Sequence, residues 1–280
     1  MGEPQGTRPG PALVTGASSG LGRDFALALA ARGHDLLLVA RRAGRLEELA
    51  ARLRNDHGVR VAVLACDLAT DDGLAAVRAA LETAPLEVAV LNAGFGSLGP
   101  FAAADRTRED RMVRLNCEAV VDLARWVIPG MCQRGRGRVL IISSAAAFHP
   151  VPYMATYGAT KAFSLHFARA LHEELRGTGV GVLAVCPGPT ATEFSEVLSH
   201  AGRGASGWPS AMPVDTPAAV VAAALDAADR HRAVVATGRI SRLTRIGTAL
   251  VPTSWTLRAV GMVHRRRART VKSAGKPDRI

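Results

Sequence analysis

The sequence predicts an α/β protein built on a parallel sheet with helices on both faces. Short runs rich in Val, Leu, Ile and Ala alternate along the chain with longer segments of helical periodicity. The short runs are apolar almost throughout, which is typical of parallel strands covered on both sides. The alternation continues from residue 11 to about residue 240 without a linker or an internal repeat. Such regularity indicates a single-domain, doubly wound sheet of the Rossmann-like kind.

The expected elements follow one another in a regular order. Strands are expected at residues 11–16, 34–40, 59–68, 86–94, 137–147, 180–189 and 233–238. Helices are expected at residues 20–33, 44–58, 156–177 and 216–230, with one more on each side of the strand at 86–94. With 48% hydrophobic residues among 280, the chain can bury a substantial core. We expect a flexible segment at residues 1–10, one folded domain over residues 11–240 and a basic extension at residues 241–280.

The charge of the chain is concentrated in that extension. Residues 1–230 hold 23 basic and 23 acidic side chains, whereas residues 231–280 hold 12 basic side chains and one acid, so the net charge of +11 belongs to the tail. Any contact with a polyanion or a membrane surface therefore concerns the tail alone. Nucleic-acid binding is not expected, because no known module is present and aromatic residues are only 4%.

The remaining composition favours a reducing, cytoplasmic setting. The first residues are polar and rich in turn formers, unlike a secretory signal, and position 6 lacks the hydroxyl of a myristoylation motif. No apolar run reaches the roughly 18 residues of a membrane span. The cysteines are scattered and the histidines form no metal-binding motif, so neither disulfides nor a metal are expected.

A glycine-rich turn follows the first expected strand. Gly16, Gly20 and Gly22 are spaced G-x-x-x-G-x-G before the first expected helix. Glycines permit a tight turn and close backbone approach, and the helix N-terminus presents free N–H groups to a pyrophosphate. Ser18 and Ser19 add hydroxyl donors. The turn is therefore predicted to bind the pyrophosphate of a dinucleotide.

The end of the second expected strand indicates which dinucleotide binds. An acidic residue there would bind the ribose 2′-hydroxyl, whereas an arginine accommodates a 2′-phosphate. This chain has Arg41 and Arg42 at that place and no acid. NADP(H) is therefore predicted over NAD(H); the alternative is that both arginines only cover the surface.

Lysine is rare in this chain, and one lysine lies on an expected helix close to a tyrosine. Only Lys161, Lys272 and Lys276 are lysines among 35 basic residues, and Tyr157 is one of two tyrosines. Where arginine is the usual cation, a single lysine indicates a site that needs a compact ammonium. Tyr157 and Lys161 are four residues apart and so share a helical face. Such a pair alone is common by chance, so the other motifs along the chain must show whether it is catalytic.

The motifs along the chain together resemble the short-chain dehydrogenase/reductase family. They are "TGASSGLG", "NAG" at Asn92–Gly94, a serine at Ser144, "YGATK" and "PGP" at Pro187–Pro189. The resemblance covers about residues 12–236. Ser144 lies 13 residues before Tyr157, which is the usual spacing of the family, and the adjacent Ser143 is the alternative.

The resemblance implies a catalytic set of Asn116, Ser144, Tyr157 and Lys161. Asn116 corresponds to the helix asparagine that positions a proton-relay water, and Asp67 to the acid beside the adenine ring. Thr190 or Thr192 would hold the nicotinamide carboxamide. With the turn and the arginines, the expected cofactor contacts are Gly16, Ser18, Ser19, Gly20, Leu21, Gly22, Arg41, Arg42, Asp67, Leu68, Asn92, Ala93, Gly94, Tyr157, Lys161, Pro187, Gly188, Thr190 and Thr192.

The chemistry of carbonyl reduction explains the tyrosine and the lysine. The reaction needs a hydride for the carbon and a proton for the oxygen, which a phenol can supply. A free tyrosine has a pKa of about 10, and a cation one helical turn away favours the phenolate. We expect Lys161 to lower the pKa of Tyr157 to about 7, roughly 4 kcal/mol, in a partly desolvated site, helped by the positive nicotinamide of the oxidised cofactor. Ser144 would donate to the substrate oxygen, and the resemblance implies that Lys161 also holds the ribose hydroxyls.

The substrate is predicted to be a small carbonyl compound or alcohol of apolar character. Residues 190–217 mix a short helical pattern with Gly-rich and Pro-rich stretches, which is typical of a mobile flap that selects substrate. Several residues could line the substrate pocket, although some of them could instead only pack in the hydrophobic core. The candidates are Phe95, Ser144, Phe148, Val151, Tyr153, Met154, Phe194 and Trp208.

Several alternatives stay open at this stage. The basic tail could lie on an anionic membrane surface, pack on a partner subunit or remain solvated. A homodimer or homotetramer is expected from the resemblance. The same residues could also serve an epimerase or an imine reductase, and a non-catalytic nucleotide-sensing protein is the rival from another class.

Overall fold

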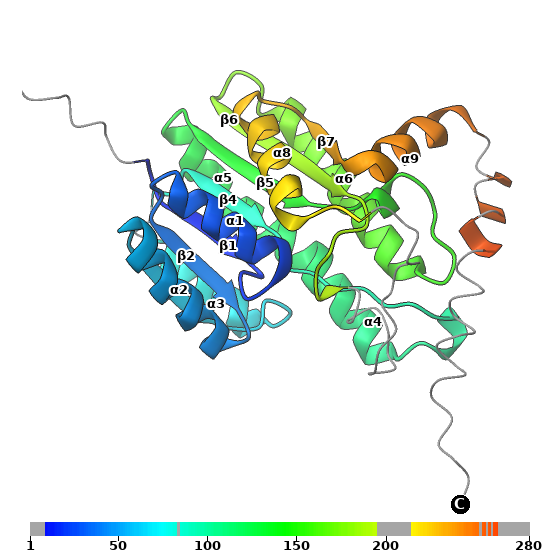
Figure 1. Cartoon of the computed structure of the whole chain (residues 1–280), viewed down its shortest axis with the longest axis horizontal. Coiled ribbons are helices and arrows are strands. Elements are labelled where there is room, and N and C mark those ends of the chain that lie inside the picture. The colour runs from blue at the N-terminus through cyan, green and yellow to red at the C-terminus, as the bar shows by residue number, and fades with distance from the viewer. Residues whose placement is uncertain are drawn as a thin grey trace, which may run out of the picture.

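The structure is a computed structural model that describes residues 9–82, 85–194, 214–251, 254–255, 257–258 and 260–262. Within these residues one parallel sheet of seven strands runs in the order β3-β2-β1-β4-β5-β6-β7 (Figure 1). The strands are β1 (Ala12–Thr15), β2 (Leu36–Ala40), β3 (Val61–Ala65), β4 (Val88–Leu91), β5 (Gly137–Ile142), β6 (Val180–Pro187) and β7 (Val234–Thr237). The predicted Rossmann-like, doubly wound fold is confirmed.

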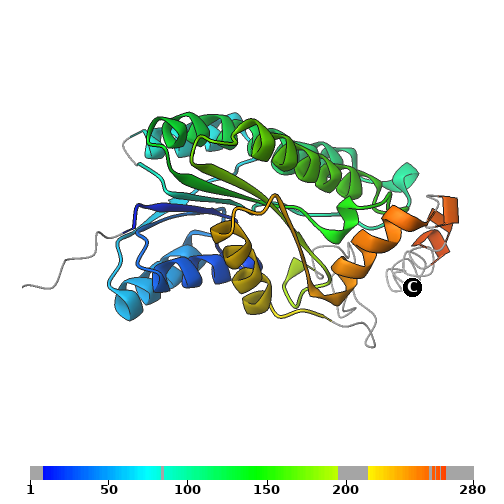
Figure 2. The same cartoon turned by 90° about the horizontal axis from the view of Figure 1, so that it is seen from above.

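Helices cover both faces of this sheet (Figure 2). One layer consists of α1 (Gly20–Ala31), α2 (Ala43–His57) and α8 (Pro217–Asp229). The other consists of α3 (Asp71–Leu81), α5 (Ala119–Gln133) and α6 (Ala155–Glu174). The structure also contains α4 (Arg106–Val113), α9 (Gly238–Leu250) and the short turns η1 (Phe101–Ala103), η2 (Arg114–Glu118) and η3 (Ala145–Ala147).

Local signals set the helix ends close to the predicted bounds. The predicted helix at 44–58 is α2, which ends at Gly58 in the left-handed conformation, with φ of +64°. α3 begins after Thr70, whose hydroxyl accepts a hydrogen bond from the Gly73 amide. α8 begins after Thr216, which caps the helix in the same way, with Pro217 in the first turn.

Alternate residues of each strand supply the two halves of the core. Val14 of β1 and Leu140 of β5 belong to the cluster under α1, α2 and α8. Leu13 and Ile141, their neighbours in sequence, belong to the cluster under α3, α5 and α6. All four are buried, which explains why these strands read as continuous apolar runs. Strand order reverses between β1 and β4, and the crevice at the carboxyl ends of these strands is where ligands bind in such sheets.

The last described helix of the domain, α9, packs onto the end of the sheet. Ser241 is fully buried, and its hydroxyl donates to the carbonyl of Cys186 at 2.7 Å. The boundary expected at residue 240 therefore falls inside a helix that packs on β6 and β7.

The four cysteines are free. Among the described residues, no helix has the length and apolarity required to span a membrane.

Candidate active site

The glycine-rich turn between β1 and α1 leaves no space for side chains at two positions. Gly16 has a φ of +67°, and a Cβ atom there would lie 2.7 Å from Asn92 Nδ2. A Cβ atom at Gly22 would lie only 2.2 Å from the carbonyl oxygen of Gly16. The amino end of α1 is thereby held against the turn, where its free N–H groups are available to an anion.

The end of β4 is tied to the end of β1 through Thr15. The side-chain amide of Asn92 donates to the Thr15 carbonyl at 2.9 Å. The Thr15 hydroxyl in turn accepts from the backbone amides of Asn92 and Ala93, at 2.9 Å and 3.0 Å. The "NAG" motif therefore lies beside the glycine-rich turn at the predicted crevice.

A cluster of hydrogen-bond donors lies at the edge of the same turn. Arg42 donates to the Ser18 hydroxyl through Nε at 3.1 Å and to the Ser19 hydroxyl through Nη2 at 2.6 Å. Its Nη1 donates to Glu193 at 2.9 Å, and Arg45 donates to the other oxygen of Glu193 at 2.6 Å. Two guanidinium groups and two hydroxyls form a donor set that suits a phosphate.

Sequence reasoning missed Arg45 and Glu193. Arg45 stands three residues after Arg42, in the first turn of α2, so helical spacing could have indicated it. Glu193 lies 148 residues further along the chain, and no local pattern connects it to the arginines.

Arg41 lies near Asp67, and its charge lowers the pKa of that carboxyl. Successive residues of an extended segment face opposite sides, which separates Arg41 from Arg42. Asp67 accepts hydrogen bonds from the Ala69 amide and the Arg111 guanidinium. Burial alone would raise the pKa of Asp67, but these two donors and the nearby Arg41 lower it. Asp67 is thus an ionised acceptor at the end of β3.

Asn116 lies in a π-helical turn, η2, between α4 and α5. It is 1% exposed, and its amide donates to the Phe95 carbonyl and the Thr160 hydroxyl, both at 3.0 Å. A Cβ atom at Gly94 would lie 2.9 Å from Asn116 Oδ1 and 3.4 Å from Lys161 Nζ. The sequence did not predict the π turn, which widens the helix where this side chain faces inward and is common at functional sites.

Ser143 and Ser144 have different partners. Ser143 is buried, and its hydroxyl donates to the Lys161 carbonyl at 2.7 Å. Ser144 is partly exposed, caps η3 and has a hydrogen bond with the Tyr157 side chain. The geometry thus brings Ser144, the serine that the spacing favours, to the phenol.

Tyr157 and Lys161 occupy adjacent turns of α6 and are each 6% exposed. Lys161 Nζ donates to the carbonyl of Ile142 at 2.8 Å and lies 5.9 Å from the centre of the Tyr157 ring. No carboxylate is paired with Lys161 among the described residues, which is unusual for a buried cation.

The expected lowering of the Tyr157 pKa to about 7 is wrong for this structure. Burial raises the pKa of Tyr157 to about 12, which the hydrogen bond with Ser144 only partly opposes. Burial also lowers the pKa of Lys161 to about 8. Both shifts follow from desolvation, which penalises the charged form of each group more than the pair stabilises it. The phenol is therefore protonated at neutral pH.

Apolar side chains gather around the Tyr157 ring. A small cluster contains Met112, Val151, Met154 and Tyr157, and Phe95 and Phe194 pack against it. The rings of Tyr157 and Phe194 are 5.4 Å apart and tilted by 43°.

The other pocket candidates differ in position from this group. Phe148 packs against the core cluster under α5 and α6 instead. Tyr153 has a φ of +68° and accepts a hydrogen bond from the Gly99 amide through its carbonyl. Trp208 lies outside the described residues. Val260 of the basic extension also packs against the cluster around Tyr157, so this part of the tail borders the candidate pocket.

The segment after β6 places both candidate threonines near the crevice. Pro187 ends β6, paired with Thr237 of β7. Thr190 donates to the Gly188 carbonyl at 3.0 Å. The Thr192 side chain faces the glycine-rich turn, 3.2 Å from where a Cβ atom on Gly20 would stand. Only the Thr192 contact reaches the glycine-rich turn, and the contacts do not test which threonine holds the carboxamide.

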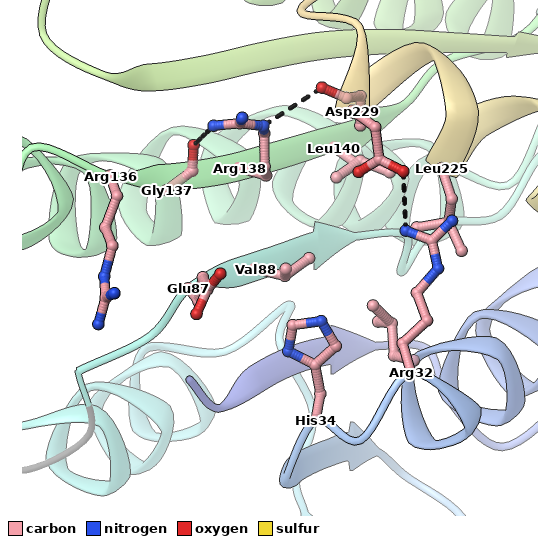
Figure 3. A pocket seen from close by; sticks show the side chains of 12 residues that line it. Arg32, His34, Glu87, Val88, Arg136, Gly137, Arg138, Leu140, Leu225 and Asp229 are labelled. Carbon is pink, nitrogen blue, oxygen red and sulfur yellow. Dashed lines mark hydrogen bonds and ion pairs between the residues drawn. The ribbon is translucent and has the colours of Figure 1, made fainter. Parts of the chain in front are cut away.

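A cavity of about 180 Å³ lies at the opposite, amino-terminal edge of the sheet (Figure 3). Arg32 and Arg138 line it, but the first is paired with Asp229 at 3.0 Å, and the second donates to backbone carbonyls and contacts His231. Because ligands of such sheets bind at the carboxyl edge, this cavity is not the candidate site. Within the described ranges, no three His, Cys, Asp or Glu side chains are grouped as a metal would require.

Comparisons with known proteins agree with this geometry. Residues 11–202 match the protein family described as short chain dehydrogenase. The very-long-chain 3-oxoacyl-CoA reductase of Anas platyrhynchos is 35% identical over 192 residues, which are 66% of this chain and 61% of that protein. The chain thus spans about three fifths of the length of that relative.

Two solved structures cover nearly the whole chain. The bulky-bulky ketone specific alcohol dehydrogenase from Comamonas testosteroni is 31% identical, with a TM-score of 0.74, over 98% of this chain and 97% of that one. A short-chain dehydrogenase from Sphingobium yanoikuyae in complex with NADPH is 35% identical, with a TM-score of 0.74, over 97% of this chain and 100% of that one.

Proposed function

The chain belongs to the short-chain dehydrogenase family, and on that premise we propose that it is an NADP(H)-dependent oxidoreductase that interconverts an apolar carbonyl compound and its alcohol. The single observation that carries the proposal is the grouping of Ser144, Tyr157, Lys161 and Asn116 beside the glycine-rich turn. When bound, the nicotinamide would donate or accept the hydride.

The residues of the crevice fit a phosphorylated dinucleotide. The turn between Gly16 and Gly22 would hold the pyrophosphate, since the amino end of α1, with its free N–H groups, is packed against it. Arg42, Arg45 and the hydroxyls of Ser18 and Ser19 would hold the 2′-phosphate. The NADPH complex of a 35% identical dehydrogenase supports this choice.

Tyr157 would supply the proton to the substrate oxygen. Its raised pKa keeps the phenol protonated at neutral pH, as a general acid requires. Ser144, hydrogen-bonded to Tyr157, would hold the same oxygen. Lys161 would oppose negative charge on the phenol once it has given up its proton. Asn116, which faces Gly94 beside Lys161, would position a water for proton replacement.

The substrate would lie against the apolar cluster around Tyr157. Phe95, Met154 and Phe194 offer a surface suited to a bulky or long-chain ketone. The names of the relatives point the same way, because one reduces very-long-chain 3-oxoacyl thioesters of coenzyme A and another is specific for bulky ketones.

A screen of cofactor consumption tests the proposal. Purified full chain would be given NADPH or NADH with apolar ketones, aldehydes and imines, and with sugars as the polar comparison. We expect oxidation of NADPH with bulky apolar ketones and little with sugars. If no carbonyl compound is turned over with either cofactor, the oxidoreductase assignment fails.

An exposed row of apolar side chains on α9 favours contact with an anionic membrane surface. Leu243, Ile246 and Leu250 are all exposed, and their spacing places them on one helical face. Residues 231–280 carry 12 basic side chains and one acid, which suits anionic lipid headgroups. We expect the chain to co-sediment with vesicles containing phosphatidylserine, and less with neutral vesicles or after Leu243→Asp with Ile246→Asp. Equal binding to both vesicle types argues against it.

A second copy of the chain would cover an apolar surface elsewhere. Val121, Trp126 and Phe163 are exposed on α5 and α6, in the same helical layer. We propose that this layer forms a homodimer or homotetramer contact. In analytical ultracentrifugation, Trp126→Glu is expected to lower the mass of the particle, and an unchanged mass would exclude this helix from the contact.

A further inference from the structure

Glu193, the acid that bridges Arg42 and Arg45, belongs to the segment after β6. Glu193 accepts from Arg42 Nη1 at 2.9 Å and from Arg45 Nη1 at 2.6 Å, one arginine on each carboxylate oxygen. All three side chains are between 43% and 48% exposed, so water can reach the pair and the bridge can exchange.

The remaining donors of Arg42 point to the glycine-rich turn. Its Nε and Nη2 donate to Ser18, and Nη2 also donates to Ser19. Glu193 is therefore the only anion in a group whose other described members are two guanidinium groups and two hydroxyls. Because a carboxylate and a phosphate use the same guanidinium edge, both cannot form these bonds with Arg42 and Arg45 at once.

Glu193 remains charged at the pH where a 2′-phosphate would compete with it. Hydrogen bonds from Arg42 and Arg45 lower the pKa of this carboxyl despite partial burial. A phosphate monoester carries between one and two negative charges near pH 7. The two anions would repel one another if both remained in the site.

The residues next to Glu193 contact the other parts of the site. The Thr192 side chain faces Gly20 of the glycine-rich turn. The Phe194 ring packs on the Tyr157 ring, with 5.4 Å between centres. Movement of Glu193 out of the arginine pair would therefore shift residues that border both the cofactor turn and the catalytic tyrosine.

We propose that Glu193 is a specificity-determining residue that competes with the 2′-phosphate for Arg42 and Arg45. It weakens the preference for phosphorylated dinucleotides and makes their binding displace the segment from Thr190 to Phe194. NAD(H), which lacks the phosphate, leaves the bridge in place. This inference rests on the proposed NADP(H)-dependent function.

The test compares ligands that differ only in the 2′-phosphate. Adenosine 2′,5′-bisphosphate and adenosine 5′-monophosphate carry no nicotinamide, so they report on the phosphate alone. In calorimetric titrations of the full chain, Glu193→Gln is expected to raise the affinity for the bisphosphate about three- to tenfold. This factor corresponds to the energy of two exposed ion pairs. The affinity for the monophosphate is expected to change less than about twofold.

A matched control is Glu173→Gln, which removes an exposed acid of α6, paired with Arg176 just beyond the helix and away from the site. It should leave both affinities unchanged, and melting curves would verify that each variant is folded. If Glu193→Gln leaves the bisphosphate affinity unchanged or weakens it while the wild type binds NADPH, the competition is refuted and the proposed function stands. If the wild type binds neither NADPH nor the bisphosphate, both are refuted.

Discussion

Charged side chains gather at both edges of the sheet, but they are paired in different ways. At the amino edge, Arg32 at the end of α1 meets Asp229 at the end of α8 (Figure 3). Arg138 of β5 contacts backbone carbonyls and His231. These partners are parts of the scaffold. At the carboxyl edge, Arg42 is bridged by Glu193 from a connecting segment.

Lys161 increases this contrast. It is a buried cation at the carboxyl edge, and its ammonium donates to a backbone carbonyl rather than to a carboxylate. At the amino edge Arg32 and Asp229 pair within the scaffold, whereas the carboxyl edge holds a buried ammonium and an exchangeable bridge. An exposed ion pair at the carboxyl edge is the better candidate for a binding role, because a ligand could replace one of its partners.

The largest effect is expected at Tyr157, the proposed proton donor. Tyr157→Phe removes the proposed proton donor and the hydrogen bond with Ser144. Turnover should fall about 10²- to 10⁴-fold, while NADPH binding stays nearly intact, because the phenol acts on the substrate oxygen. Steady-state rates and a fluorescence titration with NADPH would measure the two. Retained turnover would remove Tyr157 from the mechanism.

The second largest effect, a loss of NADPH affinity, is expected for Arg42→Asp at the carboxyl edge. It replaces the guanidinium that faces Ser18 and Ser19 with an acid, and should weaken NADPH binding about 10- to 100-fold with little change for NADH. Arg41→Asp is the matched comparison, because Arg41 lies near Asp67 instead and should have the smaller effect. Equal losses in the two variants would show that the wrong arginine has been assigned.

The buried ammonium should make stability depend on pH. Burial lowers the pKa of Lys161 from 10.5 to about 8, so between these values the unfolded chain binds more protons than the folded one, and stability rises with pH. The Tyr157 pKa is raised, so the folded chain keeps that proton, and its opposing effect begins only above about pH 10.

The variant Lys161→Met isolates this contribution. Between pH 7.5 and pH 10, the wild type should gain on the order of 1–3 kcal/mol relative to Lys161→Met. Urea unfolding at several pH values measures the difference. Parallel curves for the two proteins would mean that the ammonium is as well solvated when folded as when unfolded.

The smallest effect is expected at the amino edge. Arg138→Met removes hydrogen bonds to the carbonyls of Gly137, Gly179 and Ala228. The free energy of unfolding should fall by about 1–2 kcal/mol, since these bonds are partly exposed, while turnover per folded molecule stays unchanged. A change in KM for NADPH would show that the two edges are coupled, contrary to the contrast drawn above.

Much of the fold could be predicted because its signals are local. The strands are continuous apolar runs. Gly16 and Gly22 mark a turn in which neighbouring atoms leave no room for a Cβ atom at either position. The spacing of Ser144, Tyr157 and Lys161 placed three side chains that do lie together. Phe148 packs in the core rather than beside Tyr157, because aromatic character alone does not say which side of a strand end a residue faces.

By itself, the amino-acid sequence determined the order of the elements, the parallel sheet, the glycine-rich turn and the identity of the residues at its strand ends. Only the tertiary structure decided that Arg42 rather than Arg41 faces Ser18 and Ser19, and that Glu193 bridges Arg42 and Arg45. It also decided that burial raises the Tyr157 pKa. The physical reason is that periodicity and turn chemistry act within a few residues, whereas desolvation and ion pairing depend on every segment that the fold brings to the same place.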